Sequence, residues 1–161
     1  MCRMPDPMTL AAFDAAPPES AAAVVSVWAA IPAWVDAVVA ERADALAREW
    51  TRADLDAALA HHPRIGEKPR GTGAEAAASN REQASMAQAS TSLADAIADG
   101  NAAYEERFGR VFLIRAAGRG PDEMLAELTR RLGNDDDTEA AEALDQLRQI
   151  ALLRLRTSLE D

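Results

Sequence analysis

Apolar residues recur along the chain at the three- and four-residue spacing that is typical of amphipathic helices. The run Pro17-Pro18-Glu19-Ser20 is a helix-start signal, and residues 21–29 after it are predicted to form a short helix. Pro32 opens a second helical pattern, which keeps one apolar face to about Trp50. The first third of the chain is therefore expected to be helical.

A third helix is bounded by clear signals at both ends. Thr51 suits the N-cap position, and Asp54 follows at the third helical position. The helix must stop at His61-His62-Pro63, because proline disfavours helical backbone in the residue that precedes it. Residues 62–73 contain two prolines and three glycines, and they are expected to form a structured loop.

The remaining pattern predicts three more helical stretches. The first covers residues 79–108, with a possible break at Asp99-Gly100-Asn101. The second starts at Pro121 and ends at Gly133-Asn134, and the third covers residues 138–159. Between them, Val111–Ile114 is too short to be assigned to a helix or a strand by its periodicity.

Composition supports a helical fold. The chain has 161 residues, which suits one domain; 48% of them are hydrophobic, only 4% are aromatic, and alanine is abundant. Alanine loses no side-chain entropy in a helix, so such a core is expected to consist of packed helices. The prediction is an all-α, single-domain bundle of about seven to eight helices over residues 10–161, after a flexible N-terminal tail at residues 1–9.

Charge and cysteine usage exclude several classes of protein. The net charge is −10, which repels the phosphates of nucleic acids and anionic membrane surfaces. No apolar stretch is long enough to cross a bilayer. The only cysteine is Cys2, so neither an intramolecular disulfide nor a cysteine metal cluster is expected. We therefore expect a cytoplasmic protein without nucleic-acid or membrane partners.

The two adjacent histidines are the first candidates for chemistry. His62 follows a helix C-terminus, where the helix dipole favours a protonated imidazole, and Pro63 fixes the backbone beside it. A histidine in that setting can hold and donate a proton near neutral pH. The alternative is that the pair only caps the helix end. Without cysteines or a His-x-x-x-His spacing, no metal site is expected.

Three further groups each have a functional and a structural interpretation. Ser79-Asn80-Arg81-Glu82-Gln83 is a capping box, and a helix start of this kind also favours an anionic ligand. Residues 104–119 form a basic island whose apolar part offers backbone groups to a pocket, or else a core-crossing connection with paired arginines. Arg154 interrupts an apolar run near the end of the chain, and helix geometry alone could leave it in solvent.

Together and in this order, these groups resemble the 2-oxo-4-hydroxy-4-carboxy-5-ureidoimidazoline (OHCU) decarboxylase family. The likeness covers nearly everything from Leu10 to the end of the chain. The matching motifs are His62-Pro63-Arg64-Ile65-Gly66, Ser79-x-x-Glu82-Gln83, Tyr104-x-x-Arg107-Phe108-Gly109-x-x-Phe112-Leu113-Ile114, Gly118-Arg119, Glu123-Met124-Leu125, Arg131-Leu132-Gly133-Asn134, Glu139 and Ile150-Ala151-Leu152-Leu153-Arg154-Leu155.

The resemblance implies an all-α homodimer that converts OHCU to (S)-allantoin and carbon dioxide in urate breakdown, without metal or organic cofactor. It places His62 and Glu82 in catalytic positions and Arg154 against the charge of the substrate. The other implied substrate-binding residues are Pro63, Ser79, Gln83, Phe112, Leu113, Ile114, Arg115 and Ala116.

Two departures from the family pattern bear on the wall of the expected pocket. Ala78 stands where the family often has a tryptophan, and Arg110-Val111 stands where it often has Phe-Pro. Two other classes also fit the chain. One is a non-catalytic helical domain that binds a ligand or a protein, and the other is an acidic regulatory protein that binds a basic partner.

Overall fold

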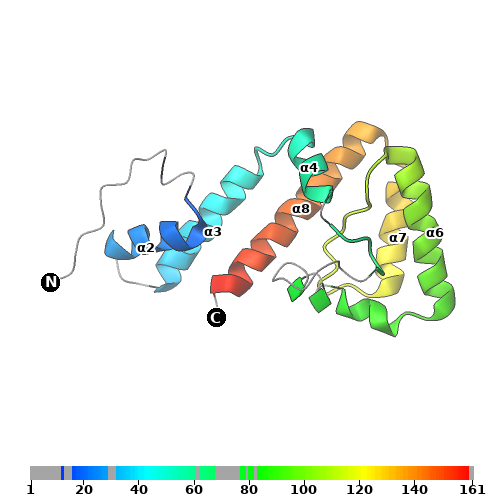
Figure 1. Cartoon of the computed structure of the whole chain (residues 1–161), viewed down its shortest axis with the longest axis horizontal. Helices are drawn as coiled ribbons and strands as arrows, with labels where there is room; N and C mark the ends of the chain where they lie inside the picture. The colour runs from blue at the N-terminus through cyan, green and yellow to red at the C-terminus, as the bar shows by residue number, and fades with distance from the viewer. Residues whose placement is uncertain are drawn as a thin grey trace. The chain divides into compact units, whose positions relative to one another are not determined.

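The computed structural model describes residues 12, 16–28, 32–60, 62–67, 77–78, 80–81 and 83–159. Within these ranges every element is a helix and there is no strand, which confirms the all-α prediction (Figure 1). The described elements are six α-helices and one 3-10 helix, against the seven to eight helices expected. They are α2 (Pro18–Trp28), α3 (Pro32–Ala47), α4 (Arg52–Leu59), the 3-10 helix η1 (Ala84–Gln88), α6 (Thr91–Phe108), α7 (Pro121–Arg131) and α8 (Asp136–Leu159).

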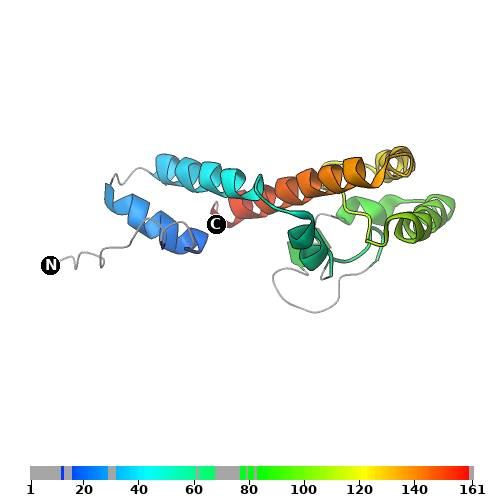
Figure 2. The ribbon, with the colours of Figure 1, turned by 90° about the horizontal axis from the view of Figure 1, so that it is seen from above.

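The chain divides into two compact units, residues 1–48 with 152–161 and residues 49–151. In the first unit α2 packs against α3 (Figure 2). Val25, Val35 and Val39 of these helices are buried. In the second unit α6 packs against α7. No helix among the described residues is long and apolar enough to cross a membrane.

The second unit contains two hydrophobic clusters. One is built mainly on α6 and α7, with Tyr104 and Leu128 among its fully buried side chains. The other joins α4 to α8 through Leu55 and Leu147, among others. Burial of such apolar surface is the main driving force for packing these helices.

An irregular segment, Gly109–Gly118, runs between the two clusters. Phe112, Ile114 and Ala116 belong to the α6–α7 cluster, whereas Leu113 belongs to the α4–α8 cluster. Alternate side chains that face opposite ways are typical of extended backbone. The segment that the sequence could not assign is thus buried on both of its sides, although it belongs to no helix or strand.

The predicted boundaries of α4 are confirmed. The Thr51 side chain accepts a hydrogen bond from the backbone N–H of Asp54, and the Asp54 carboxylate accepts from the backbone N–H of Thr51 at 2.7 Å. This reciprocal capping satisfies donors that the first turn leaves without partners. The helix ends at Leu59, just before the histidine pair and Pro63.

The helical run expected over residues 79–108, with its possible break at Asp99-Gly100-Asn101, differs from the structure in two respects. η1 ends at Gln88 and α6 begins at Thr91, because Ser90 caps a new helix by accepting from the N–H of Leu93. The break expected at Asp99-Gly100-Asn101 does not occur. Gly100 lies inside α6, where a Cβ atom would come within 2.6 Å of a Leu128 methyl group, so the glycine permits close packing against α7.

Candidate functional site

A small cavity in the second unit gathers most of the predicted site residues. Its volume is about 20 Å³, and its walls come from the chain after α4, from the turn before η1, from the Gly109–Gly118 segment and from α8. The lining residues are His62, Pro63, Ile65, Gln83, Phe112, Leu113, Ile114, Ala116 and Ile150. Ile65 and Ile150 were not singled out as site residues, although both lie in the motifs of the family resemblance.

His62 enters this cavity from the C-terminal end of α4. Its backbone N–H donates to the carbonyl of Leu59 at 3.2 Å, which closes the last turn before Pro63 leads the chain away. Both His62 and Pro63 are half-buried. His62 therefore follows the C-terminal end of α4, where the helix dipole favours a positive charge, and the other residues that line the cavity are mostly apolar.

Two contacts with α6 hold the chain that follows Pro63. Arg64 forms an ion pair with Glu105, and Arg64 Nη2 lies 2.8 Å from Glu105 Oε2. The side-chain amide of Asn101 donates to the carbonyl of Ile65 at 3.0 Å. The hydrogen bond from Arg64 lowers the pKa of the Glu105 carboxyl, so this pair is charged at neutral pH.

Gln83 is fixed in orientation by the same loop. Its Oε1 accepts a hydrogen bond from the backbone N–H of Gly66 at 3.0 Å, and Gly66 has a φ of 87°. Few residues other than glycine adopt that backbone geometry readily. Because Oε1 already accepts the hydrogen bond from Gly66, the N–H groups of Nε2 are the part of the amide that can bind a ligand.

The Gly109–Gly118 segment is held by side chains of α7 and α8. Arg131 Nη1 donates to the carbonyl of Leu113 at 2.7 Å, and Gln146 Oε1 accepts from the backbone N–H of Arg115 at 2.9 Å. The N–H of Arg115 is therefore engaged, although it was expected to meet the substrate. Arg115 does not line the small cavity, so its predicted substrate contact stays a prediction.

Besides Arg115, three predicted site residues are not placed against this cavity. Ser79 and Glu82 lie outside the described residues. Arg154 is half-buried on α8, in the part of the helix that belongs to the first compact unit. Their roles remain predictions from the family resemblance.

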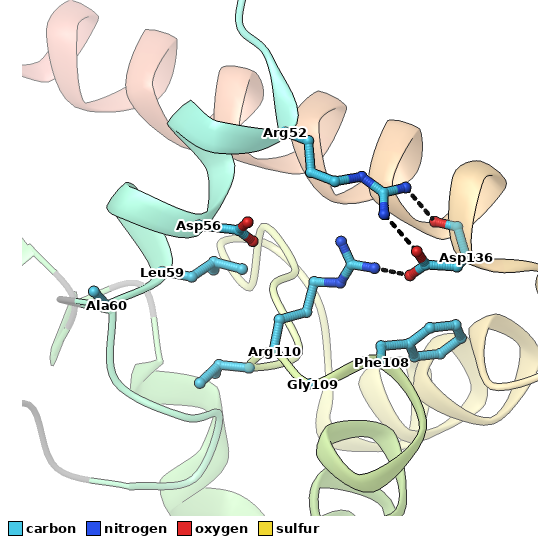
Figure 3. A pocket seen from close by; sticks show the side chains of 9 residues that line it. Arg52, Asp56, Leu59, Ala60, Phe108, Gly109, Arg110 and Asp136 are labelled. Atoms are coloured by element: carbon cyan, nitrogen blue, oxygen red, sulfur yellow. Dashed lines mark hydrogen bonds and ion pairs between the residues drawn. The ribbon is translucent and has the colours of Figure 1, made fainter.

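A larger cavity, of about 410 Å³, lies beside Gly109, Arg110 and Val111 (Figure 3). Arg52 and Arg110 reach into it and both bind the carboxylate of Asp136, as Figure 3 shows. Arg52 also donates to Asp137 at 2.9 Å. The hydrogen bond from Arg52 lowers the pKa of Asp136, so the acid is charged and the arginines are already neutralised.

Arg110, where the sequence departs from the family pattern, thus does not lie in the pocket wall where it was expected. Its side chain lines the larger cavity, and neither Arg110 nor Val111 lines the cavity that contains His62. Ala78 does not line the small cavity either. Among the described lining residues of the cavity that contains His62, none is a departure from the family pattern.

Comparisons with known proteins agree on one family. The family model described as OHCU decarboxylase matches residues 3–156. A 2-oxo-4-hydroxy-4-carboxy-5-ureidoimidazoline decarboxylase of Haloferax volcanii is 33% identical over 97 residues, which cover 60% of this chain and 56% of that protein. An enzyme of the same name from Amia calva is 38% identical over 60 residues, or 37% of this chain and 34% of that protein.

A solved structure supports the same conclusion. A crystal structure of an OHCU decarboxylase in the presence of (S)-allantoin aligns with a TM-score of 0.65 and 26% identity. The alignment covers 78% of this chain and 82% of that one. The match with the two curated relatives spans about half of one and a third of the other.

Proposed function

The chain belongs to the OHCU decarboxylase family, and we propose that it decarboxylates OHCU to (S)-allantoin during urate breakdown. One observation carries the proposal most directly. His62, Gln83 and the buried Phe112–Ala116 segment are separate in sequence, yet side chains from all three line one cavity. These are the places where the family resemblance puts the catalytic histidine, the substrate-binding helix start and the backbone that meets the ring.

The chemistry needs an electron sink and a proton. When the bond between the ring carbon and the carboxylate breaks, carbon dioxide leaves and the bonding electrons remain on the ring. They spread into the unsaturated ring as an enolate-like species, and one proton then completes allantoin. Replacing a carboxylate by a proton balances atoms and charge. A site of this kind has to favour the enolate over the bound substrate and to deliver the proton to one face.

We assign the proton delivery to His62. The imidazole lies at the end of α4, beside the apolar residues Phe112 and Ile114. A protonated imidazole can donate to a developing negative charge at near-neutral pH. Because it enters the cavity from one side, it explains a single enantiomer. The spontaneous reaction in water has no reason to choose a hand.

The other predicted groups hold the substrate. Nε2 of Gln83 can donate to a carbonyl of the ureido group, and backbone N–H groups near Leu113 and Ile114 can donate to ring oxygens. We further propose that Glu82 binds the hydroxyl and ureido groups and that Arg154 binds the carboxylate. A cavity of about 20 Å³ has room for about one water molecule, so substrate binding has to widen it.

Circular dichroism tests the proposal. Freshly generated OHCU is mixed with the full chain, and the dichroic signal of allantoin is followed beside a protein-free reaction. We expect a faster signal of one sign, and a Glu82→Ala variant that is slower by about 100-fold. If the wild type adds nothing to the spontaneous rate, the non-catalytic binding domain becomes the better interpretation.

We also propose that the protein is a homodimer, which the family resemblance implies, and that it is cytoplasmic, which its charge and cysteine usage favour. Sedimentation equilibrium over a range of protein concentrations would measure the subunit number. A purely monomeric chain at micromolar concentration would contradict the first of these two proposals.

A further inference from the structure

We propose that Arg131, held by Glu139, is a positioning residue for the decarboxylation, because it fixes the backbone and the aromatic ring that form one wall of the cavity. The inference rests on the proposed function. Both residues belong to motifs that the family resemblance matched without giving them a role.

Arg131 is buried and makes contact in three directions. Its exposed fraction is 1%, and that of Glu139 is 0%. The Nε atom donates to the Glu139 carboxylate at 3.0 and 3.2 Å, while Nη1 donates to the carbonyl of Leu113 at 2.7 Å. The guanidinium carbon also lies 4.7 Å from the ring centroid of Phe112. One side chain thus binds a counter-charge, a backbone carbonyl and an aromatic ring.

The hydrogen bond from Arg131 to the Leu113 carbonyl also orients the next backbone amide, that of Ile114. The peptide unit is planar and trans, so the N–H of Ile114 points to the side opposite the Leu113 carbonyl. When Arg131 holds that carbonyl, it therefore also sets the direction of the Ile114 N–H, one of the amides proposed to meet the substrate. Leu113 and Ile114 both line the cavity.

A second layer of side chains holds Glu139 in place. The Tyr104 hydroxyl donates to Glu139, and the Asn134 side-chain amide donates to Glu139 Oε2 at 2.9 Å. The Tyr104 ring meets Phe112 edge to face, with 5.1 Å between the ring centroids. Burial raises the pKa of the Tyr104 phenol, which keeps it a hydrogen-bond donor at working pH.

A gain in fold stability is not enough to explain the buried ion pair of Arg131 and Glu139. Desolvation offsets much of the attraction in a buried ion pair, and apolar residues of similar volume often stabilise a fold as well. What apolar residues cannot do is donate to the carbonyl of Leu113. The planar guanidinium can bind Glu139 and that carbonyl together, and lysine cannot reproduce this fork.

The neighbouring residue provides a matched control. Arg130 also joins α7 to α8, because it binds Glu142 there, and it binds Glu127 on its own helix. The Arg130 side chain is 49% exposed, and none of its described hydrogen bonds reaches the Gly109–Gly118 segment. Adjacent arginines thus make similar links between the same helices, but only Arg131 reaches the cavity wall.

The experiment compares two double variants with the wild type. Arg131→Met with Glu139→Gln removes the buried charges while leaving an acceptor for Tyr104. Arg130→Met with Glu127→Gln is the more exposed counterpart, and it leaves in place Glu142, which also lies 3.9 Å from Arg131 Nε. The unfolding midpoint, kcat, KM and the enantiomeric excess of allantoin are measured for each. Enzyme concentrations are adjusted so that the catalysed rate exceeds the spontaneous rate by the same factor.

We expect the Arg131 double variant to fold, to lose about 10-fold in kcat and to give allantoin of lower enantiomeric excess. The Arg130 double variant should match the wild type in kcat and enantiomeric excess. If the buried double variant does not fold, the single Arg131→Lys variant is measured in the same way. Lysine keeps the charge and loses the fork.

Three outcomes would overturn the inference. They are wild-type kcat and enantiomeric excess in a folded Arg131 variant, equal losses in the Arg130 control, and failure of both Arg131 variants to fold, which would assign the pair to stability alone. Wild-type turnover is measured first, and its absence would contradict the proposed function instead.

Discussion

Two cavities lie along the same two stretches of chain, the end of α4 and the Gly109–Gly118 segment, and they differ in what their polar groups do. The larger one, of about 410 Å³, presents arginines that are already bound to Asp136. The smaller one, of about 20 Å³, combines an imidazole and an oriented amide with apolar walls. Volume alone would select the larger cavity, not the one proposed as the site.

The contrast shows that a polar group indicates a binding site when it still has hydrogen-bonding capacity that a ligand can use. Guanidinium groups that share a carboxylate fasten two parts of the chain together, as Arg52 and Arg110 do through Asp136. A histidine and a glutamine in an apolar surrounding can instead donate to a ligand that enters. Two substitutions test this contrast, and a third tests the ion pair that holds the chain after Pro63.

His62→Ala should lower kcat by about 100-fold or more while the fold stays intact, because the variant lacks the proposed proton donor. Steady-state circular dichroism of allantoin formation gives the rate, and far-ultraviolet dichroism gives the helix content. His61→Ala is the adjacent control and should keep its activity. A folded His62→Ala protein with wild-type kcat would remove His62 from the mechanism.

Arg110→Met should leave kcat within about twofold of the wild type and lower the free energy of unfolding by about 1 kcal/mol. The Arg110 side chain is only 6% exposed, but Asp136 is 52% exposed and remains solvated when its partner is lost. Urea titration measures the loss. A large fall in kcat without a change in stability would mean that the larger cavity takes part in the reaction.

Glu105→Gln should destabilise the fold by less than about 1 kcal/mol, and only above acidic pH. The hydrogen bond from Arg64 lowers the pKa of Glu105 below its usual 4.5, so the folded chain binds its proton later than the unfolded chain as pH falls. The stabilisation by the Arg64–Glu105 pair is complete above the usual pKa of 4.5. It disappears as the pH falls through the lower folded-state pKa of Glu105.

Urea midpoints of the wild type and of Glu105→Gln should therefore differ at pH 7 and converge as the pH falls through the folded-state pKa of Glu105. Glu106→Gln, at the exposed neighbouring position, is the control. A difference that persists unchanged at the lower pH would show that charge is not the origin of the effect.

Local signals in the sequence predicted local structure well. Thr51 with Asp54, and the proline after His62, define both ends of α4 because capping and proline sterics act within a few residues. Gly100 misled the prediction for the opposite reason. Its place in α6 depends on Leu128, which lies 28 positions away on α7, and helix propensity contains no such information.

The candidate site was predicted by family resemblance more than by residue patterns. A pattern could mark His62 as unusual, but only the fold shows that Gln83 and Phe112 share a cavity with it. The contact between Arg131 and the Leu113 carbonyl joins residues 18 positions apart, and its only sequence signal was a motif without a stated role.

The fixed amide of Gln83 has a consequence for which molecules this cavity accepts. Since Gly66 occupies the oxygen, the cavity offers N–H groups at that point, and it should select by hydrogen-bond polarity as well as by shape. A ureide can present a carbonyl at that point, which matches these donors. An amidine or guanidine of the same shape has N–H groups where the ureide has a carbonyl oxygen, so donors would face the Gln83 donors. Leaving these buried donors without acceptors is costly, and this gives the cavity a basis for rejecting nitrogen analogues of the substrate.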